Sequence, residues 1–236
     1  MPSLMLTAHG SADPRSAVTT HAVADEIRRQ RPDIDVLVAF CENSEPNLRD
    51  VLAGLHGRPA VVTPLLLASA YHARVDIPAM VAESGTEVVQ ADTLGEDPRL
   101  VEVMAQRLAQ RGVESHHTDT GVLVVAVGSS HTAANAQTAT LAATLAQGRQ
   151  WAGTEVVYAT GPQPSVAEGI ASLRRAGASR IVLAPWFIAP GRITDRVAAI
   201  AASAGVEMAE PLGAHHLVAA TVLDRFDHAV AQRLAA

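Results

Sequence analysis

The sequence contains no lysine, since all 18 of its basic residues are arginine. Schiff-base catalysis and the phosphate-binding lysine of the Walker motif both require an ε-amine, so the sequence excludes both. Aromatic residues make up only 3% of the chain, and the net charge is -6. A chain with few stacking rings and an acidic balance is not expected to bind nucleic acid.

The chain also has too few cysteines for a disulfide or a cysteine-rich metal site. Its single cysteine, Cys41, can form neither an intramolecular disulfide nor a thiolate-rich zinc site. No basic segment followed by an apolar one stands at the start, and no apolar run approaches the roughly 18 residues of a membrane span. We therefore expect a cytoplasmic protein with no membrane partner.

The second half of the chain repeats the first. "LMLTAHGS" aligns with "LVVAVGSS", "FCENSEPNLRDVLAGL" with "YATGPQPSVAEGIASL", and "LGEDPRLVEVMAQR" with "LGAHHLVAATVLDR", each pair 118 residues apart. Between them, "TPLLLASAYHARVDIP" aligns with "APWFIAPGRITDRV" at a spacing of 121. The duplication predicts two similar domains, at residues 1–115 and 119–236, with a linker around residues 111–121. Because such a chain supplies its own pseudo-two-fold pair, we expect a monomer.

Each half alternates predicted strands and helices. In the first half we expect strands at residues 4–8, 35–40, 60–67 and 87–90, and helices at residues 16–30, 47–55, 75–83 and 97–110. Asp13-Pro14 and Glu45-Pro46-Asn47 have the composition of helix starts. This alternation favours an α/β fold of two similar, doubly wound parallel-sheet domains.

Two histidines follow the first and third predicted strands. His9 ends the apolar run of "LMLTAHGSADPRS", and His72 follows "TPLLLASAY". The carboxyl ends of parallel strands meet at the edge where such sheets bind ligands. The second half has Val127 in place of His9, and Arg192 or its neighbour in place of His72. We therefore predict that His9 and His72 share one divalent metal ion, with a capping or core role as the alternative for each ring.

Glu42 follows the second predicted strand, in "AFCENSEP". A carboxylate beside two imidazoles suits a divalent first-row metal, or can take up protons released there. A solvated acid at a helix start explains Glu42 equally well. A serine hydrolase is disfavoured because neither Ser11 nor Ser69 lies in a G-x-S-x-G elbow, and the first strand lacks the G-x-G-x-x-G turn of dinucleotide-binding proteins.

The segments "AHGSADPR", "AFCENSEPNL" and "TPLLLASAYHARVDIP", in this order, resemble the class II tetrapyrrole chelatases. The resemblance covers essentially the whole chain and is to the long, internally duplicated sirohydrochlorin chelatases of siroheme and cobalamin biosynthesis. It implies a lyase that inserts Fe²⁺ or Co²⁺ into sirohydrochlorin without ATP, with Ni²⁺ or Zn²⁺ as substitutes in vitro. It also implies that His9 and His72 are the metal-site histidines. Ala12 stands where the family usually has an arginine, so a substrate contact at that position is not supported.

Metal insertion requires a distorted macrocycle, removal of its pyrrole protons and a partly dehydrated metal ion. Two neutral imidazoles can hold the ion, and one of them can accept a proton. We expect His9 to be that acceptor because it precedes the flexible Gly10-Ser11 turn, and we count Glu42 with the catalytic residues.

The carboxylates of the tetrapyrrole require arginines or helix amino termini. The candidate substrate contacts are Ser11, Arg74, Arg192 and Arg196. Solvated surface charge is the alternative for each arginine. A non-catalytic metal or tetrapyrrole carrier of the same fold is the alternative function for the whole chain.

Overall fold

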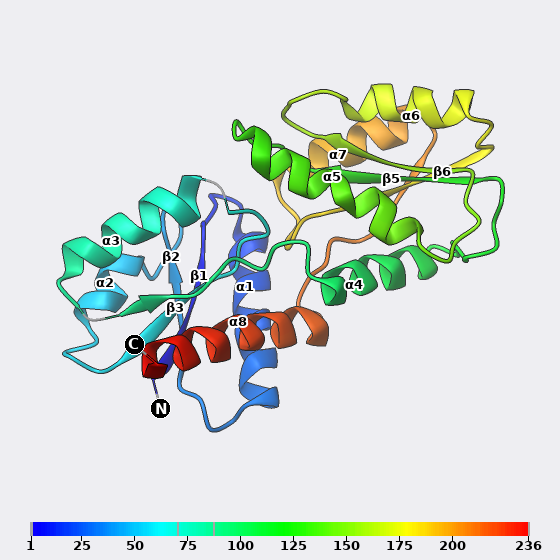
Figure 1. Cartoon of the computed structure of the whole chain (residues 1–236). Helices are drawn as coiled ribbons and strands as arrows, with labels where there is room; N and C mark the ends of the chain where they lie inside the picture. The colour runs from blue at the N-terminus through cyan, green and yellow to red at the C-terminus, as the bar shows by residue number, and fades with distance from the viewer. Residues whose placement is uncertain (1, 70, 87, 236) are drawn as a thin grey trace. The chain divides into compact units, whose positions relative to one another are not determined.

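A computed structural model of the protein describes residues 2–69, 71–86 and 88–235. These residues form two four-stranded parallel sheets with helices packed against them (Figure 1). The chain divides into two compact units: the first runs to Asp97 and resumes at Ala214, and the second is Pro98–Gly213.

The sheet of the first unit has the strand order β2-β1-β3-β4. Its strands are β1 (Ser3–Ala8), β2 (Val36–Phe40), β3 (Ala60–Pro64) and β4 (Val89–Gln90). Every residue of β1 is buried, as expected for a parallel strand with helices on both faces. One face, with Met5 and Val62, packs against α2 (Leu48–Ala53) and α3 (Ile77–Ser84). The other carries α1 (Pro14–Gln30) beside α8 (His216–Ala235), drawn blue and red in Figure 1.

The second unit repeats this architecture with the strand order β6-β5-β7-β8. Its strands are β5 (Thr120–Ala126), β6 (Gly153–Tyr158), β7 (Arg180–Pro185) and β8 (Glu207–Met208). Helices α6 (Val166–Arg175) and α7 (Arg192–Ser203) cover one face of the sheet. Helices α4 (Pro98–Ala109) and α5 (Thr132–Ala146) contact each other, and they contact β7 and β6 respectively.

The two sheets also share their pairing register. Central and second strands pair with the same 118-residue offset found in the sequence, whereas the third strand is offset by 121. The equivalent pairs are Leu4–Val36 and Leu4–Val61 in the first sheet, and Val122–Thr154 and Val122–Val182 in the second. The duplication and the compensating gaps predicted from the sequence are therefore confirmed at the level of backbone pairing.

The last helix of each repeat packs in the unit of the other repeat. Helix α4, from the first repeat, buries Leu100, Val103 and Leu108 in the second unit. Helix α8, from the second repeat, buries Val222 and Phe226 in the first unit. The two repeats have thus exchanged their final helices.

Equivalent arginines fasten the exchanged helices. The Arg107 side chain donates from Nη2 to the Leu212 carbonyl at 3.1 Å, and Arg225 donates from Nη2 to the Leu94 carbonyl at 2.9 Å. Both arginines, like both leucines, are 118 residues apart. The same contact is therefore made twice, each time between residues of different repeats.

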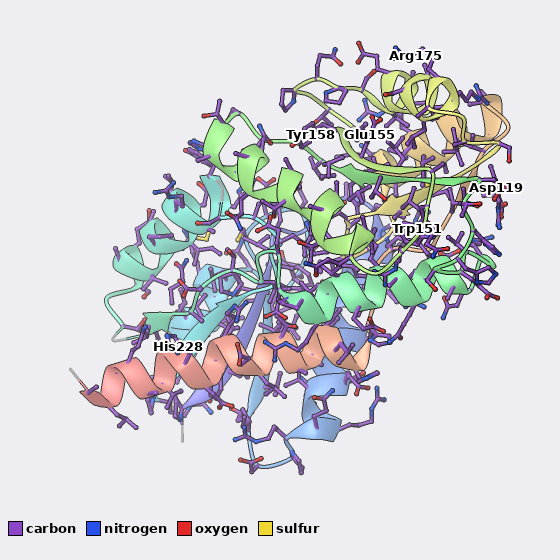
Figure 2. All side chains as sticks on the ribbon, turned by 45° about the vertical axis from the view of Figure 1, so that its right-hand side comes forward. Asp119, Trp151, Glu155, Tyr158, Arg175 and His228 are labelled. Carbon is purple, nitrogen blue, oxygen red and sulfur yellow. The ribbon has the colours of Figure 1, made fainter. Side chains whose placement is uncertain are left out.

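The predicted domains, 1–115 and 119–236, coincide with the two sequence repeats. The compact units differ from them because each unit contains the final helix of the other repeat. The apolar face of α4 packs in the second unit, so the chain passes from one unit to the other between Asp97 and Pro98. The segment predicted as a linker lies within the second unit, where the Trp151 indole donates to the Glu114 carbonyl at 2.9 Å. Figure 2 labels Trp151.

The predicted helix starts are confirmed, because Asp13 and Asn47 accept hydrogen bonds from the first turns of α1 and α2. Strand β3 ends earlier than predicted, at Pro64, which lacks an N–H for the ladder. A π-helical turn, η1 (His72–Asp76), precedes α3 and begins before the predicted helix. Glu87, predicted to start the fourth strand, lies outside the described residues, as do the outer ends of the predicted domains at residues 1 and 236.

Within the described part of the chain, no helix combines the length and the apolar composition that crossing a membrane requires.

Candidate metal centre

The carboxyl ends of β1 and β2 are tied closely together. Glu42 donates its backbone N–H to the His9 carbonyl at 3.0 Å. Between them Gly10 has a φ of 90°, and a Cβ at this position would lie 1.7 Å from the Glu42 carbonyl oxygen. Only glycine allows this approach, which holds the Glu42 and His9 side chains at the same sheet edge.

His9 and His72 lie against each other at this edge. Their ring centroids are 3.9 Å apart and the ring planes meet at 84°. His9 follows β1, and His72 begins η1 after β3. Strands β1 and β3 are neighbours at the topological switch point of the sheet, since the chain adds β2 on one side of β1 and β3 on the other. The prediction that the two histidines lie close together is confirmed.

His9 and Glu42 form a pair suited to a cation. The Nδ1 atom of His9 lies 2.8 Å from the Gly10 carbonyl, which can only accept, so Nδ1 carries the ring proton in this contact. The other ring nitrogen, Nε2, lies 3.2 Å from Glu42 Oε1. Two atoms with lone pairs attract each other at this distance through a shared proton or a cation. The arrangement can therefore take up a proton or bind a divalent ion.

His72 has a different partner, which sequence reasoning did not single out. Its Nδ1 atom lies 2.5 Å from Asp76 Oδ2, one turn further along. The only sequence signal for this contact is the four-residue spacing, which also fits an ordinary solvated acid on a helix.

The candidate site is open to solutes. The side chains of His9 and His72 are 36% and 38% exposed. Tyr71 and Val75 lie beside His72 in sequence and are exposed although both are large and apolar. Among the described residues, no three histidine, cysteine or acidic side chains are arranged as a preformed metal cage.

Cys41 is near these groups but is not available as a ligand. The thiol is buried, and burial, reinforced by the charges of Asp76 and Glu42, raises its pKa to about 11. Cys41 is 4% exposed and packs in the apolar cluster with Leu48 and Ile77, so a metal ion arriving from solvent does not reach the sulfur.

The predicted substrate contacts are distributed over both units. Ser11 lies in the loop after His9, where its hydroxyl accepts from the Asp13 N–H at 3.0 Å. Arg74 is exposed on η1. Arg192 and Arg196 are exposed on the first turns of α7, in the second unit. Ser11 and Arg74 thus share a unit with the histidines.

The second unit has the same glycine turn after its central strand but lacks the histidines of the first unit. Gly128 repeats the geometry of Gly10, with a φ of 93° and a hypothetical Cβ 1.7 Å from the Gly161 carbonyl oxygen. Counted along the aligned strands, neutral side chains replace three of the four ionisable ones, since Val127, Thr160 and Ile193 stand where the first unit has His9, Glu42 and His72. Asp76 precedes the buried Ile77, and Arg196 precedes the equivalent buried Val197.

Comparisons with known proteins agree with the duplicated fold. The CbiX family model matches residues 3–111 and again residues 121–229. The sirohydrochlorin cobaltochelatase of Priestia megaterium is 25% identical over 213 residues, covering 84% of this chain and 67% of the relative. The sirohydrochlorin ferrochelatase of the same organism is 26% identical over 208 residues, covering 84% and 77%. SirB from Bacillus subtilis with Fe³⁺ matches the fold with a TM-score of 0.81 at 20% identity, covering 100% of this chain and 98% of that one.

Proposed function

The chain belongs to the CbiX family, and from that premise we propose that it is an ATP-independent sirohydrochlorin chelatase, a lyase that inserts Fe²⁺ or Co²⁺ into the macrocycle. One observation supports this most: two half-exposed imidazoles 3.9 Å apart at a sheet edge, with a carboxylate beside one of them. The metal is a substrate in this reaction, so the protein must hold it and also release it.

His9 and His72 hold the incoming ion in this proposal. Imidazole nitrogens accept Fe²⁺, Co²⁺, Ni²⁺ and Zn²⁺ alike, so the choice of metal depends on supply as well as on the site. A site with two imidazoles binds more weakly than a closed four-ligand cage, which favours transfer to the pyrrole nitrogens.

His9 is the better candidate for accepting a pyrrole proton. Its Nε2 atom already faces Glu42, whose exposed carboxylate can pass a proton on to solvent. His72 then acts mainly as the metal-binding group. The His9 ring has its lone pair on Nε2 alone, so it accepts the proton only after it has released the ion to His72 or to the macrocycle.

Arginines and apolar side chains would hold the tetrapyrrole. Arg74 lies on the same helical turn as His72, and Tyr71 and Val75 offer an exposed apolar surface next to it. We extend the proposal to Arg192, Arg196 and Ser11 as contacts for the peripheral carboxylates. The cytoplasmic location and the monomeric state stay predictions from the sequence.

The test is direct insertion by the purified protein. Sirohydrochlorin is mixed with Co²⁺ or Fe²⁺ under anaerobic conditions, and the change in its visible spectrum is followed with and without protein. We expect catalysed insertion with many turnovers per protein molecule. Tight binding of metal or macrocycle without turnover would identify the chain as a carrier instead. Ni²⁺ and Zn²⁺ in the same assay define the metal range.

A further inference from the structure

Asp76 contacts the Nδ1 atom of the His72 ring. The two residues are the first and last of the π-helical turn η1, and His72 Nδ1 lies 2.5 Å from Asp76 Oδ2. An ionised carboxylate can only accept a hydrogen bond, so the contact requires the proton of a neutral ring to be on Nδ1. The lone pair of that ring is then on Nε2, the remaining nitrogen.

We propose that Asp76 is a positioning residue that fixes His72 as the Nδ1–H tautomer, so that Nε2 is presented to the incoming metal. The proposal rests on the proposed function, since it assigns His72 the task of binding the ion. A carboxylate behind a ligating histidine also increases the electron density on the metal-binding nitrogen. Asp76 touches neither metal nor macrocycle in this role.

The turn that carries both residues is anchored independently of their contact. Ile77 donates its N–H to the His72 carbonyl, which closes the π-helical turn. The Gln90 side chain, from the sheet edge, donates to the Ala73 carbonyl at 2.7 Å. The backbone under His72 is therefore held by two bonds that do not involve the Asp76 side chain.

The second unit shows that this fold does not need a carboxylate here. The buried Ile77 of α3 corresponds to the buried Val197 of α7, since Gly85 and Gly205, both at positive φ, follow them by eight residues. Asp76 therefore corresponds to Arg196. His72 corresponds to Ile193, because each lies eight residues beyond the proline that ends its strand. A histidine and its carboxylate thus occur together in one repeat and are absent together from the other.

The experiment compares Asp76→Ala with Glu83→Ala, a control that removes one negative charge from the helix following η1 and leaves the site untouched. The Glu83 carboxylate pairs with Arg49 at 2.9 Å on the surface. Histidine is labelled with ¹⁵N, and the His72 tautomer is read from its two ring-nitrogen chemical shifts in metal-free protein above the imidazole titration range. Co²⁺ affinity is then measured by titration.

We expect wild type and Glu83→Ala to show the Nδ1–H tautomer of His72 and equal Co²⁺ affinity. Asp76→Ala should populate the Nε2–H tautomer and lose about 10- to 100-fold in Co²⁺ affinity, the usual effect of removing such a partner. Asp76→Asn, which keeps the shape, should shift both readouts in the same direction and serves if the alanine variant does not fold.

The proposal is overturned if Asp76→Ala keeps Nδ1–H as its sole tautomer, or if its Co²⁺ affinity stays within about twofold of wild type. Failure of the proposed function is separately visible. In that case wild-type protein would insert no metal into sirohydrochlorin, while the tautomer and Co²⁺ affinity would still decide the role of Asp76.

Discussion

The two units share one fold but carry different residues at the equivalent edge of their sheets. Strand order, pairing register and the glycine turn after the central strand are common to both. In the first unit this edge carries two histidines and two acids, and in the second the equivalent residues are Val127, Thr160, Ile193 and Arg196. Because the second sheet forms without them, the ionisable groups of the first are not required for folding.

Comparing the two repeats distinguishes residues that the fold requires from residues that serve a function, and it needs no other sequence. Gly10 and Gly128 recur because both turns pass within contact distance of a carbonyl. Arg107 and Arg225 recur because both exchanged helices need an anchor. His9 and His72 do not recur, which leaves function as the reason for their presence. Substitutions made in equivalent pairs can test each assignment.

The largest effect is expected at the histidines. His9→Ala and His72→Ala should each lower kcat/KM for metal insertion by about 1,000-fold, since each removes a ligand or a proton acceptor. Val127→Ala and Ile193→Ala, at the equivalent positions, should stay within a few-fold of wild type. Single-turnover insertion and metal titration are measured on all four variants.

The two histidine variants should also differ from each other. His9→Ala should lower turnover strongly and retain part of the metal affinity, whereas His72→Ala should lose both. Equal losses of affinity without turnover in the wild type would favour a carrier. A large loss of insertion in Val127→Ala would contradict the division of labour between the units.

The glycine turns should give the next largest effect. Gly10→Ala places a Cβ against the Glu42 carbonyl at positive φ and should cost about 2–4 kcal/mol in the free energy of unfolding. Gly128→Ala meets the Gly161 carbonyl in the same way and should cost a similar amount. Urea unfolding measures both. Only Gly10→Ala should also weaken Co²⁺ binding, and equal loss of binding in both variants would count against a site confined to the first unit.

The exchanged helices should be unequally anchored. Arg225 donates to the Thr93 and Leu94 carbonyls and pairs with the buried Asp97 at 3.0 Å. Its replacement by methionine, which keeps the apolar stem, should cost about 2–3 kcal/mol in the free energy of unfolding.

Arg107→Met is the matched control for Arg225→Met. The Arg107 guanidinium contacts the Leu212 carbonyl and, at the surface, the Gln110 side chain. The loss in this variant should be about 1 kcal/mol, measured by the same urea titration. A loss as large as that of Arg225→Met would show that the two anchors are equivalent.

Much of this arrangement could be predicted from the sequence. The repeats place strands in register, and parallel strands bring the residues that follow them to one edge, which predicted the approach of His9 to His72 and the place of Glu42. The helix exchange could not be predicted in this way. Helices α4 and α8 occupy equivalent positions in two similar repeats, so the sequence pattern does not indicate which of the two sheets each helix covers.

The π-helical turn and the role of Asp76 could not be predicted from the sequence pattern either. The η1 turn is five residues long, too short for a periodic signal. Asp76 on its own is indistinguishable from a solvated helix acid, and only the position of its carboxylate against His72 Nδ1 gives it a role. The Arg107–Arg225 equivalence was visible in the aligned segments, but its meaning required the contacts.

A smaller effect is expected for the arginines of α7. Arg192 and Arg196 project from one face of a helix in the second unit, and they would contact substrate carboxylates. Replacing both by alanine should raise KM for sirohydrochlorin about tenfold and leave Co²⁺ affinity unchanged. The control is Arg174→Ala with Arg175→Ala, on α6 of the same unit. An unchanged KM would show that the second unit does not bind substrate through these side chains.

The smallest effect is expected at Cys41, whose equivalent in the second repeat is Ala159. Burial raises the pKa of the Cys41 thiol from 9.0 to about 11, so the folded state disfavours the thiolate. The unfolded chain therefore loses this proton first as pH rises, and the stabilisation present below pH 9 is lost between about pH 9 and 11. Cys41→Ala should lose less of its free energy of unfolding than wild type between pH 8 and 10, as measured by urea titration at each pH. Metal insertion should be unchanged, and a fall in insertion would mean that the sulfur belongs to the site.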